Sequence, residues 1–148
     1  PDWTRVIPKT GSAKNTVTFD GLALQRKLRR LSAVTVGRTS CALVGDGSRI
    51  AIAVRDSFTG DGDIEAEDHI DAAGDAFEAS FNLGLVRDAL QAIGGDDVTV
   101  SAEDSTSPHV FSSAAEGMRF YVVMPMRAGQ TLEQSRIALE RLRQGAAA

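Results

Sequence analysis

The sequence predicts an α+β fold made of two strand–helix–three-strand repeats, with pseudo-two-fold symmetry and the repeat helices on one face. Three observations support this prediction. Apolar residues recur at helical spacing in residues 21–33 and again in residues 83–93. A short strand-like run precedes each of these segments, and further strand-like runs follow it. The length of 148 residues suits one ordinary domain, so both repeats are expected to share a core.

The first repeat begins with a predicted strand at residues 17–19. Asp20 is suited to cap the helix that follows, and leucines recur along that helix at near-helical spacing. Asp46-Gly47 lies between two apolar runs, which is a strong hairpin signal. The three strands after the helix are predicted at residues 40–44, 49–54 and about 63–70.

The second repeat follows the same order. Residues 76–81 alternate like a strand, Asn82 can cap a helix, and Gly94-Gly95 can end it. The remaining strands are predicted at residues 98–100, 110–111 and 120–123. After Arg127 the pattern changes, and residues 130–144 predict one amphipathic helix with Leu132, Ser135, Leu139 and Leu142 on one stripe.

Charge is sorted along the chain although the net charge is only −4. Residues 1–55 carry +7, residues 56–110 carry −13 and the remainder carries +2. An asymmetry of this size indicates an electrostatic partner for at least one part of the chain. The single cysteine, Cys41, excludes an intramolecular disulfide and is expected in the core of a protein from a reducing compartment.

The sequence predicts no catalytic residues, no metal site and no cofactor. His69 and His109 are expected to be surface or half-buried strand residues. Strand alternation aims the acidic side chains between residues 61 and 67 along one face without converging them on a point. We therefore expect a partner-facing edge there, although an enzyme that uses this acidic cluster with a metal is a minor alternative. The cluster consists of Asp61, Asp63, Glu65, Glu67 and Asp68.

The first predicted helix carries four cations within the five residues 26–30. They can share a solvated surface, or they can contact a phosphate backbone without base specificity. No aromatic side chain is interleaved to stack on bases, which argues against single-strand recognition.

Four separated segments resemble bacterial DNA polymerase III sliding clamps, the β subunit, in order and spacing. The resemblance covers residues 1–127, and the Val-Val-Met-Pro-Met-Arg ending is its strongest part. The segments are Pro1 to Lys9, Phe81-Asn82, Asp104 to Pro108 and Tyr121 to Arg127. The resemblance implies a DNA-clamp fold with residues 1–15 as the end of the preceding domain, 16–127 as the C-terminal domain and 128–148 as a helical tail.

The resemblance also implies a function and its residues. A clamp is a processivity factor and not an enzyme: two subunits form a cytoplasmic ring around duplex DNA and dock polymerases, the clamp loader and repair proteins through Gln-x-x-Leu-x-Phe/Leu motifs. The implied peptide pocket comprises Pro1, Arg5, Val6, Ser105, Thr106, Pro108, Val122, Val123, Met124, Pro125, Met126 and Arg127. The implied DNA-facing residues are Arg26, Lys27, Arg29, Arg30 and Arg87, and the implied homodimer interface holds Ala33, Val34, Glu65, Glu67 and Asp68.

Two alternatives concern the chain's length and its tail. The chain is expected to be a fragment of a longer clamp, and the alternative is a free-standing, single-domain, clamp-like adaptor that binds peptides without encircling DNA. Residues 134–139 have the outline of a clamp-binding motif. The tail is therefore a hypothetical occupant of a peptide pocket, in which case deleting residues 129–148 should tighten peptide binding.

Overall fold

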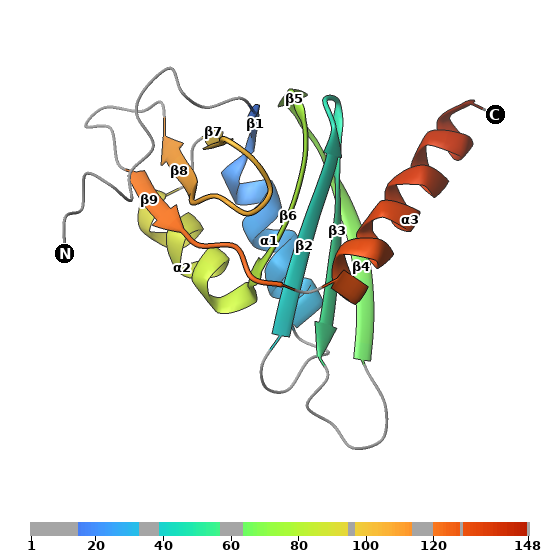
Figure 1. Cartoon of the computed structure of the whole chain (residues 1–148), viewed down its shortest axis with the longest axis horizontal. Coiled ribbons are helices and arrows are strands. Elements are labelled where there is room, and N and C mark those ends of the chain that lie inside the picture. Colours follow the sequence, from blue (N-terminus) through green and yellow to red (C-terminus); the bar gives the residue numbers. More distant parts are fainter. Residues whose placement is uncertain are drawn as a thin grey trace.

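The structure is a computed structural model that describes residues 15–32, 39–56, 64–94, 97–113, 120–127 and 129–147 (Figure 1). Twelve elements are found in these residues. In chain order they are β1 Asn15–Asp20, α1 Gly21–Ser32, β2 Thr39–Asp46, β3 Arg49–Asp56, β4 Ile64–Asp71, β5 Ala73–Gly74, β6 Ala76–Asn82, α2 Leu83–Ile93, β7 Asp97–Ala102, β8 His109–Ser113, β9 Phe120–Val123 and α3 Gly129–Ala147.

The strands form two antiparallel sheets that exchange their first strands. One sheet has the order β5-β1-β7-β8-β9 and the other has the order β4-β3-β2-β6. Thus β1 of the first repeat pairs with β7 of the second, with Val17 opposite Val100, and β6 pairs with β2 of the first. This interlocking confirms the predicted α+β fold of two strand–helix–three-strand repeats.

The repeat helices begin and end as their sequences predict. The Asp20 carboxylate accepts hydrogen bonds from the Leu22 and Ala23 amides at the start of α1. The Asn82 side chain accepts one from the Leu85 amide at the start of α2, which ends at Gly94 with φ 79°. Leu22 differs from expectation: it lies off the buried stripe and is 39% exposed.

One hydrophobic core lies under α1 and α2 and receives side chains from both sheets. Leu24, Leu28 and Leu31 of α1 are buried in it. Phe81 of β6 packs edge-on against Phe111 of β8, with their ring centroids 5.8 Å apart. Phe81 and Phe111 therefore join strands that belong to different sheets.

The third helix covers the opposite face of the four-stranded sheet (Figure 1). Alternation along β3 sends Ile50 and Ile52 to the main core and Ala51 to the other side. There Ala51 and Val44 pack against Ala138 and Leu139 of α3. The predicted amphipathic tail helix is confirmed, and it is an integrated layer of the fold.

Two expectations need correction, and one strand was not expected. His109 is fully buried at 2% exposure, because its strand β8 lies between β7 and β9. The two-residue strand β5 was not predicted, since it is too short to carry an alternation pattern. Leu139, within the motif-like tail segment, is buried against the sheet in α3, so this segment does not occupy the chain's own predicted peptide pocket.

Among the described residues, no helix combines the length and apolar composition needed to span a membrane.

Candidate peptide groove and charged surfaces

The β8–β9 pair brings together two of the predicted site segments. His109 at the start of β8 lies opposite Val123 at the end of β9. The turn that enters β8, residues 103–108, and the segment that leaves β9, residues 124–127, therefore start from the same end of this strand pair. We call residues 124–127 the crossing segment, because it leads from the five-stranded sheet towards α3 on the four-stranded sheet (Figure 1).

Ser80 of β6 fixes the crossing segment. The Met126 amide donates to the Ser80 carbonyl oxygen at 2.7 Å. The Ser80 hydroxyl donates to the Met126 carbonyl oxygen at 2.5 Å. These two bonds hold both the amide and the carbonyl of Met126 against β6, which is an edge strand of its sheet. Ser80 is itself only 4% exposed.

Apolar side chains are exposed along β9 and the crossing segment. Phe120 is 50%, Tyr121 38%, Met124 53% and Met126 42% exposed. These are four of the seven large hydrophobic residues that are exposed in the described part of the chain. Phe120 and Tyr121 are consecutive residues of β9 and point to opposite faces of the strand. Met124 and Met126, which follow the strand, are the candidate interaction surface, whereas single exposed apolar residues are ordinary. Val122 and Pro125 are half-buried beside them, Val123 lies in the core and Arg127 is exposed.

The neighbouring turn is held by its own polar side chains. The Asp104 carboxylate accepts hydrogen bonds from the amides and hydroxyls of Thr106 and Ser107. The Ser107 and Thr106 hydroxyls lower the pKa of Asp104 from 3.8 to about 2. Ser105 and Thr106 are exposed and Pro108 is half-buried. The turn is thus a preformed polar wall beside the apolar crossing segment.

His109 supports this wall from inside the molecule. Its ring shares a 2.8 Å hydrogen bond between Nδ1 and the Ser107 carbonyl oxygen, and it meets the ring of Phe81 edge-on at 5.1 Å. Burial lowers the pKa of His109 below its ordinary value. The favoured form of His109 is therefore the neutral imidazole, in which Nδ1–H donates to the Ser107 carbonyl oxygen. This histidine has a structural role.

A cavity of about 400 Å³ opens between the two sheets on the inner side of this turn. Its apolar lining includes Val17, Val44 and Phe77, and Asp104 and Ser105 stand among its other lining residues. The crossing segment does not line this cavity. We therefore define the candidate groove separately, as the surface formed by residues 124–127 and the turn at residues 103–108.

Sequence reasoning missed Ser80, which binds the crossing segment, and the exposure of Leu85 on α2. The alternation of residues 76–81 predicts only a strand at Ser80, and nothing in the sequence distinguishes Ser80 from the other polar residues of β6, Glu78 and Asn82. Leu85 lies off the apolar stripe of α2 and is 51% exposed in its first turn. Pro1, Arg5 and Val6, which the resemblance adds to the pocket, lie outside the described residues.

The predicted DNA-facing residues lie on adjacent helices, since α1 and α2 are in contact. Arg26, Arg29 and Arg30 of α1 are exposed, and so is Arg87 of α2. Lys27 differs from them because its ammonium group is 3.0 Å from the Asp68 carboxylate of β4. The exposed cations are thus arginines whose guanidinium groups face solvent from the helix layer.

The predicted interface acids lie on β4, an edge strand of its sheet. Glu67 and Asp68 follow each other and therefore point to opposite faces. Glu67 is bound by Arg141 of α3 at 2.9 Å. Burial disfavours the charge of Asp68, but hydrogen bonds from the His69 amide and Lys27 outweigh it and lower the pKa of Asp68. Ala33 and Val34, and the side chain of Glu65, lie outside the described residues.

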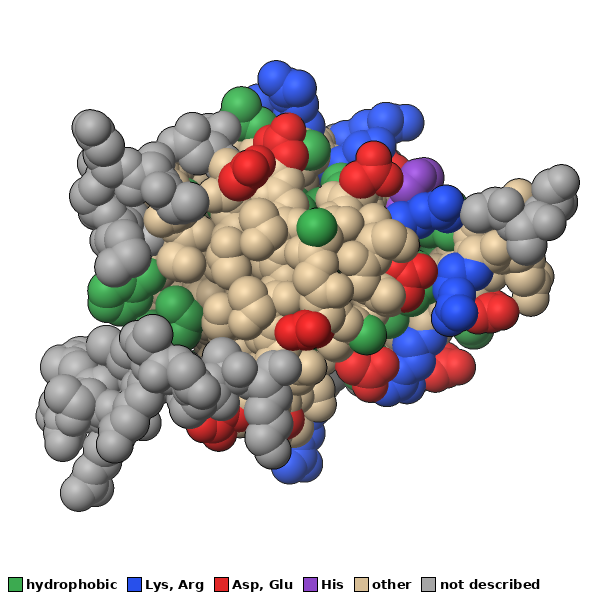
Figure 2. Space-filling view, turned by 90° about the horizontal axis from the view of Figure 1, so that it is seen from above, with side chains coloured by type: hydrophobic (Ala, Val, Ile, Leu, Met, Phe, Trp, Pro, Cys, Tyr) green, Lys and Arg blue, Asp and Glu red, His purple; other side chains and the backbone are tan. Residues whose placement is uncertain are grey.

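Basic and acidic side chains are interleaved on the side of the molecule that carries α3 and β4 (Figure 2).

Within the described part of the chain, no three histidine, cysteine, aspartate or glutamate residues come together in a group that could hold a metal ion. Asp61 and Asp63 lie outside it. Cys41 is buried, and burial raises the pKa of its thiol to about 12.

Comparisons with known proteins agree with this architecture. A family model described as the DNA polymerase III beta subunit, C-terminal domain, matches residues 4–127. A beta sliding clamp from Caulobacter vibrioides is 27% identical over 128 residues, which are 86% of this chain and 33% of that protein. The clamp from Synechocystis sp. is 25% identical over 130 residues, or 86% of this chain and 32% of that protein. The chain thus spans about a third of the length of these relatives.

Solved structures give the same result. Caulobacter crescentus pol III beta superposes with a TM-score of 0.74 at 26% identity, covering 86% of this chain and 34% of that one. The Pseudomonas aeruginosa sliding clamp bound to griselimycin superposes with a TM-score of 0.72 at 26% identity over the same shares. Since the family model covers most of the residues and the fold is shared, the chain belongs to the family of C-terminal domains of the bacterial DNA polymerase III beta subunit, the sliding clamp.

Proposed function

We propose that this chain is the part of a replicative sliding clamp that docks the clamp's protein partners. The observation that carries this proposal is the crossing segment, which exposes Met124 and Met126 beside the preformed Asp104–Pro108 turn. In the full-length protein the ring would encircle duplex DNA in the cytoplasm and tether polymerases and repair proteins to it. The chain would supply binding energy and carry out no chemistry of its own.

The groove suits a short extended peptide with apolar anchors. Methionine side chains are flexible and polarisable, so Met124 and Met126 can close around leucine or phenylalanine side chains of different shape. The hydroxyls of Ser105 and Thr106 offer hydrogen bonds to a glutamine that sets the register. These features fit a Gln-x-x-Leu-x-Phe/Leu motif. A relative from Pseudomonas aeruginosa binds griselimycin, which supports ligand binding by this protein family.

The helix layer suits loose contact with duplex DNA. Arg26, Arg29, Arg30 and Arg87 are exposed on α1 and α2 and would face the central hole of the ring. Guanidinium groups on a rigid helix contact phosphates without reading bases, which permits sliding. Lys27 would contribute less, because Asp68 already neutralises it. The β4 edge is the proposed ring interface, where Glu67 and Asp68 would contribute less charge because Arg141 and Lys27 already bind them.

Fluorescence anisotropy of a labelled Gln-Ala-Ala-Leu-Ala-Phe peptide tests the groove. We expect saturable binding to the full chain and none of a control peptide in which alanine replaces glutamine, leucine and phenylalanine. Equal binding of both peptides would contradict a motif-reading groove. The single-domain adaptor alternative differs in assembly: sedimentation of the product of the whole natural reading frame gives a ring-sized dimer for a clamp and a single-domain species for an adaptor.

A further inference from the structure

Helix α3 lies beyond the part of the chain that matches the family, because the family model ends at residue 127. It begins at Gly129, immediately after the crossing segment. The crossing segment is therefore attached at both ends, to β9 in one sheet and to α3 on the other. The contacts of α3 with the sheet therefore determine the position of the C-terminal end of the crossing segment.

Buried polar contacts fix α3 on the four-stranded sheet. Ser135 is 0% exposed, and its hydroxyl lies 2.8 Å from the Ala51 carbonyl oxygen and 3.3 Å from that of Ala42. The hydroxyls of Thr131 and Ser40 are hydrogen-bonded at 2.5 Å. A small residue at position 135 also lets the helix approach the strands closely. These contacts set the rotation and the register of α3.

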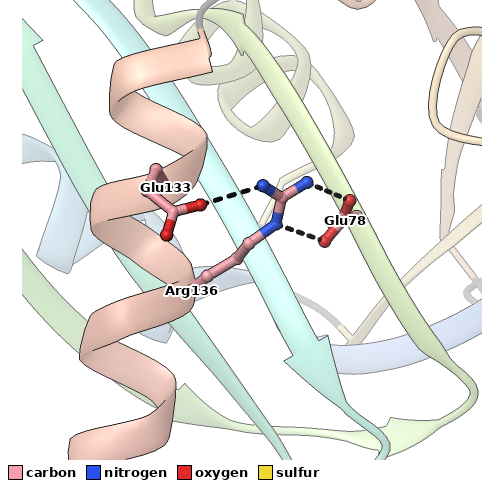
Figure 3. Close-up of polar contacts among 3 residues, drawn as sticks. All are labelled: Glu78, Glu133 and Arg136. Carbon is pink, nitrogen blue, oxygen red and sulfur yellow. Dashed lines mark hydrogen bonds and ion pairs between the residues drawn. The ribbon is translucent and has the colours of Figure 1, made fainter.

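Arg136 ties α3 to the same strand that holds the crossing segment (Figure 3). Its guanidinium group binds both carboxylate oxygens of Glu78 on β6, at 2.9 and 2.5 Å, and also Glu133 at 3.1 Å. The hydrogen bond to Arg136 lowers the pKa of Glu78. Glu78 and Ser80 are two residues apart on β6 and so share one face of the strand. Arg136 and the Ser80–Met126 hydrogen bonds are thus adjacent anchors.

We infer that α3 is a positioning element for the candidate groove, and this inference rests on the proposed function. With α3 docked, the crossing segment joins two anchored elements, β9 and α3. Its backbone is then already ordered before a peptide arrives, so less conformational freedom is lost on binding. If α3 leaves the sheet, only the two hydrogen bonds to Ser80 hold Met126. The fraction of molecules with a formed groove then falls, and the apparent dissociation constant rises by the inverse of that fraction.

The sign of this effect is opposite to that of a tail that blocks the pocket. A competing tail would weaken peptide binding when present, so its undocking would tighten binding. A positioning helix gives the reverse, because docked α3 and a bound peptide favour the same conformation of the crossing segment.

Two neighbouring substitutions on α3 separate the possibilities. Ala138→Glu places a carboxylate where Ala138, 6% exposed, contacts the sheet, and Ile137→Glu alters the adjacent side chain, which is 48% exposed. Two quantities are measured on the full chain: hydrogen exchange of the Met126 amide by NMR, and affinity for the labelled Gln-Ala-Ala-Leu-Ala-Phe peptide. We expect A138E to speed Met126 exchange at least about tenfold and to weaken binding about fivefold. I137E should change each by less than about twofold.

Arg136→Gln provides a second variant that removes only the exposed ion pairs to Glu78 and Glu133, so it retains the fold even if A138E does not. It should speed Met126 exchange about twofold to fourfold. The inference is overturned if Met126 exchange is unchanged while the Leu139 amide of α3 has become fast, or if peptide affinity is unchanged or improved. Should the wild-type chain bind no motif peptide, the proposed function fails, and the exchange measurements alone still decide whether α3 positions the segment.

Discussion

Replacing Ser80 with alanine tests whether the hydrogen bonds to Met126 hold the candidate groove. The substitution removes the hydroxyl that donates to the Met126 carbonyl oxygen at 2.5 Å and leaves the backbone bond from the Met126 amide in place. One such bond contributes about 1 kcal/mol net, and Ser80 is buried enough that water does not replace it well.

The expected consequences are quantitative. The free energy of unfolding in urea should fall by about 1 kcal/mol with an unchanged slope, and the melting temperature should fall by about 2–4 °C. The dissociation constant for the labelled motif peptide should rise by no more than about fivefold, the equivalent of the same 1 kcal/mol.

Ser112→Ala is a matched control for this measurement. The Ser112 hydroxyl also donates to a backbone carbonyl, that of Thr99, but at 3.4 Å and within the five-stranded sheet. A bond that long contributes little, so this variant should change stability by less than about 0.3 kcal/mol and leave peptide binding unchanged. Equal effects of the two substitutions, or tighter peptide binding by Ser80→Ala, would refute the proposed role of Ser80.

Three further predictions concern the groove, the turn and the core. Replacing Met124 and Met126 together by alanine should abolish motif-peptide binding in the anisotropy assay while leaving the circular dichroism spectrum and melting temperature nearly unchanged, because both side chains are exposed. The pKa of Asp104 is lowered from 3.8 to about 2, so its contribution to the stability of the turn is present above pH 3.8 and is lost as pH falls towards 2. The Thr106 amide resonance in NMR spectra should therefore titrate with a midpoint near 2. Asp104→Asn should remove that titration. Phe81→Ala should lower the free energy of unfolding by about 3–5 kcal/mol in urea titrations, since it leaves a cavity between the sheets, and a loss below about 1 kcal/mol would contradict its place in the core.

The helices and tight turns could be predicted because their signals are local. Asp20 and Asn82 cap helices through bonds to amides two or three residues away, and the apolar stripes depend only on helical spacing. The Asp46-Gly47 hairpin is similar: the Asp46 carboxylate accepts from the Ser48 and Arg49 amides, and Gly47 adopts φ 100°. Such contacts join residues that are only a few positions apart, so the local sequence is enough to predict them.

The pairing of strands between the repeats could not be predicted in the same way. Placing β1 beside β7 joins residues about 80 positions apart, such as Thr18 and Thr99, whose hydroxyls are hydrogen-bonded. Strand alternation shows which side chains share a face, but it does not name the neighbouring strand. The burial of His109 has a different cause, because β8 lies between β7 and β9 of its own repeat and the imidazole packs against Phe81 of the other sheet. This contact is also distant in the chain, so the histidine was wrongly expected at or near the surface.

The candidate site shows the same division. The two methionines, the segment from Asp104 to Pro108 and the basic helix were singled out from short motifs and from the family resemblance that those motifs carry. The anchors supplied by Ser80 and Arg136 were not, because each bonds to a partner that is 46 or 58 residues away in the chain.

By itself, the sequence determined the two repeats, their helix caps and stripes, the separation of charge and the family to which the chain belongs. Only the tertiary structure decided that the repeats exchange strands, that Glu67 and Asp68 have partners on opposite faces of β4, and that the tail helix covers the sheet beside the crossing segment. The physical reason is the range of the interactions. Capping, turn chemistry and periodicity act between neighbours in the chain, whereas burial, strand pairing and ion pairing depend on which distant surfaces meet.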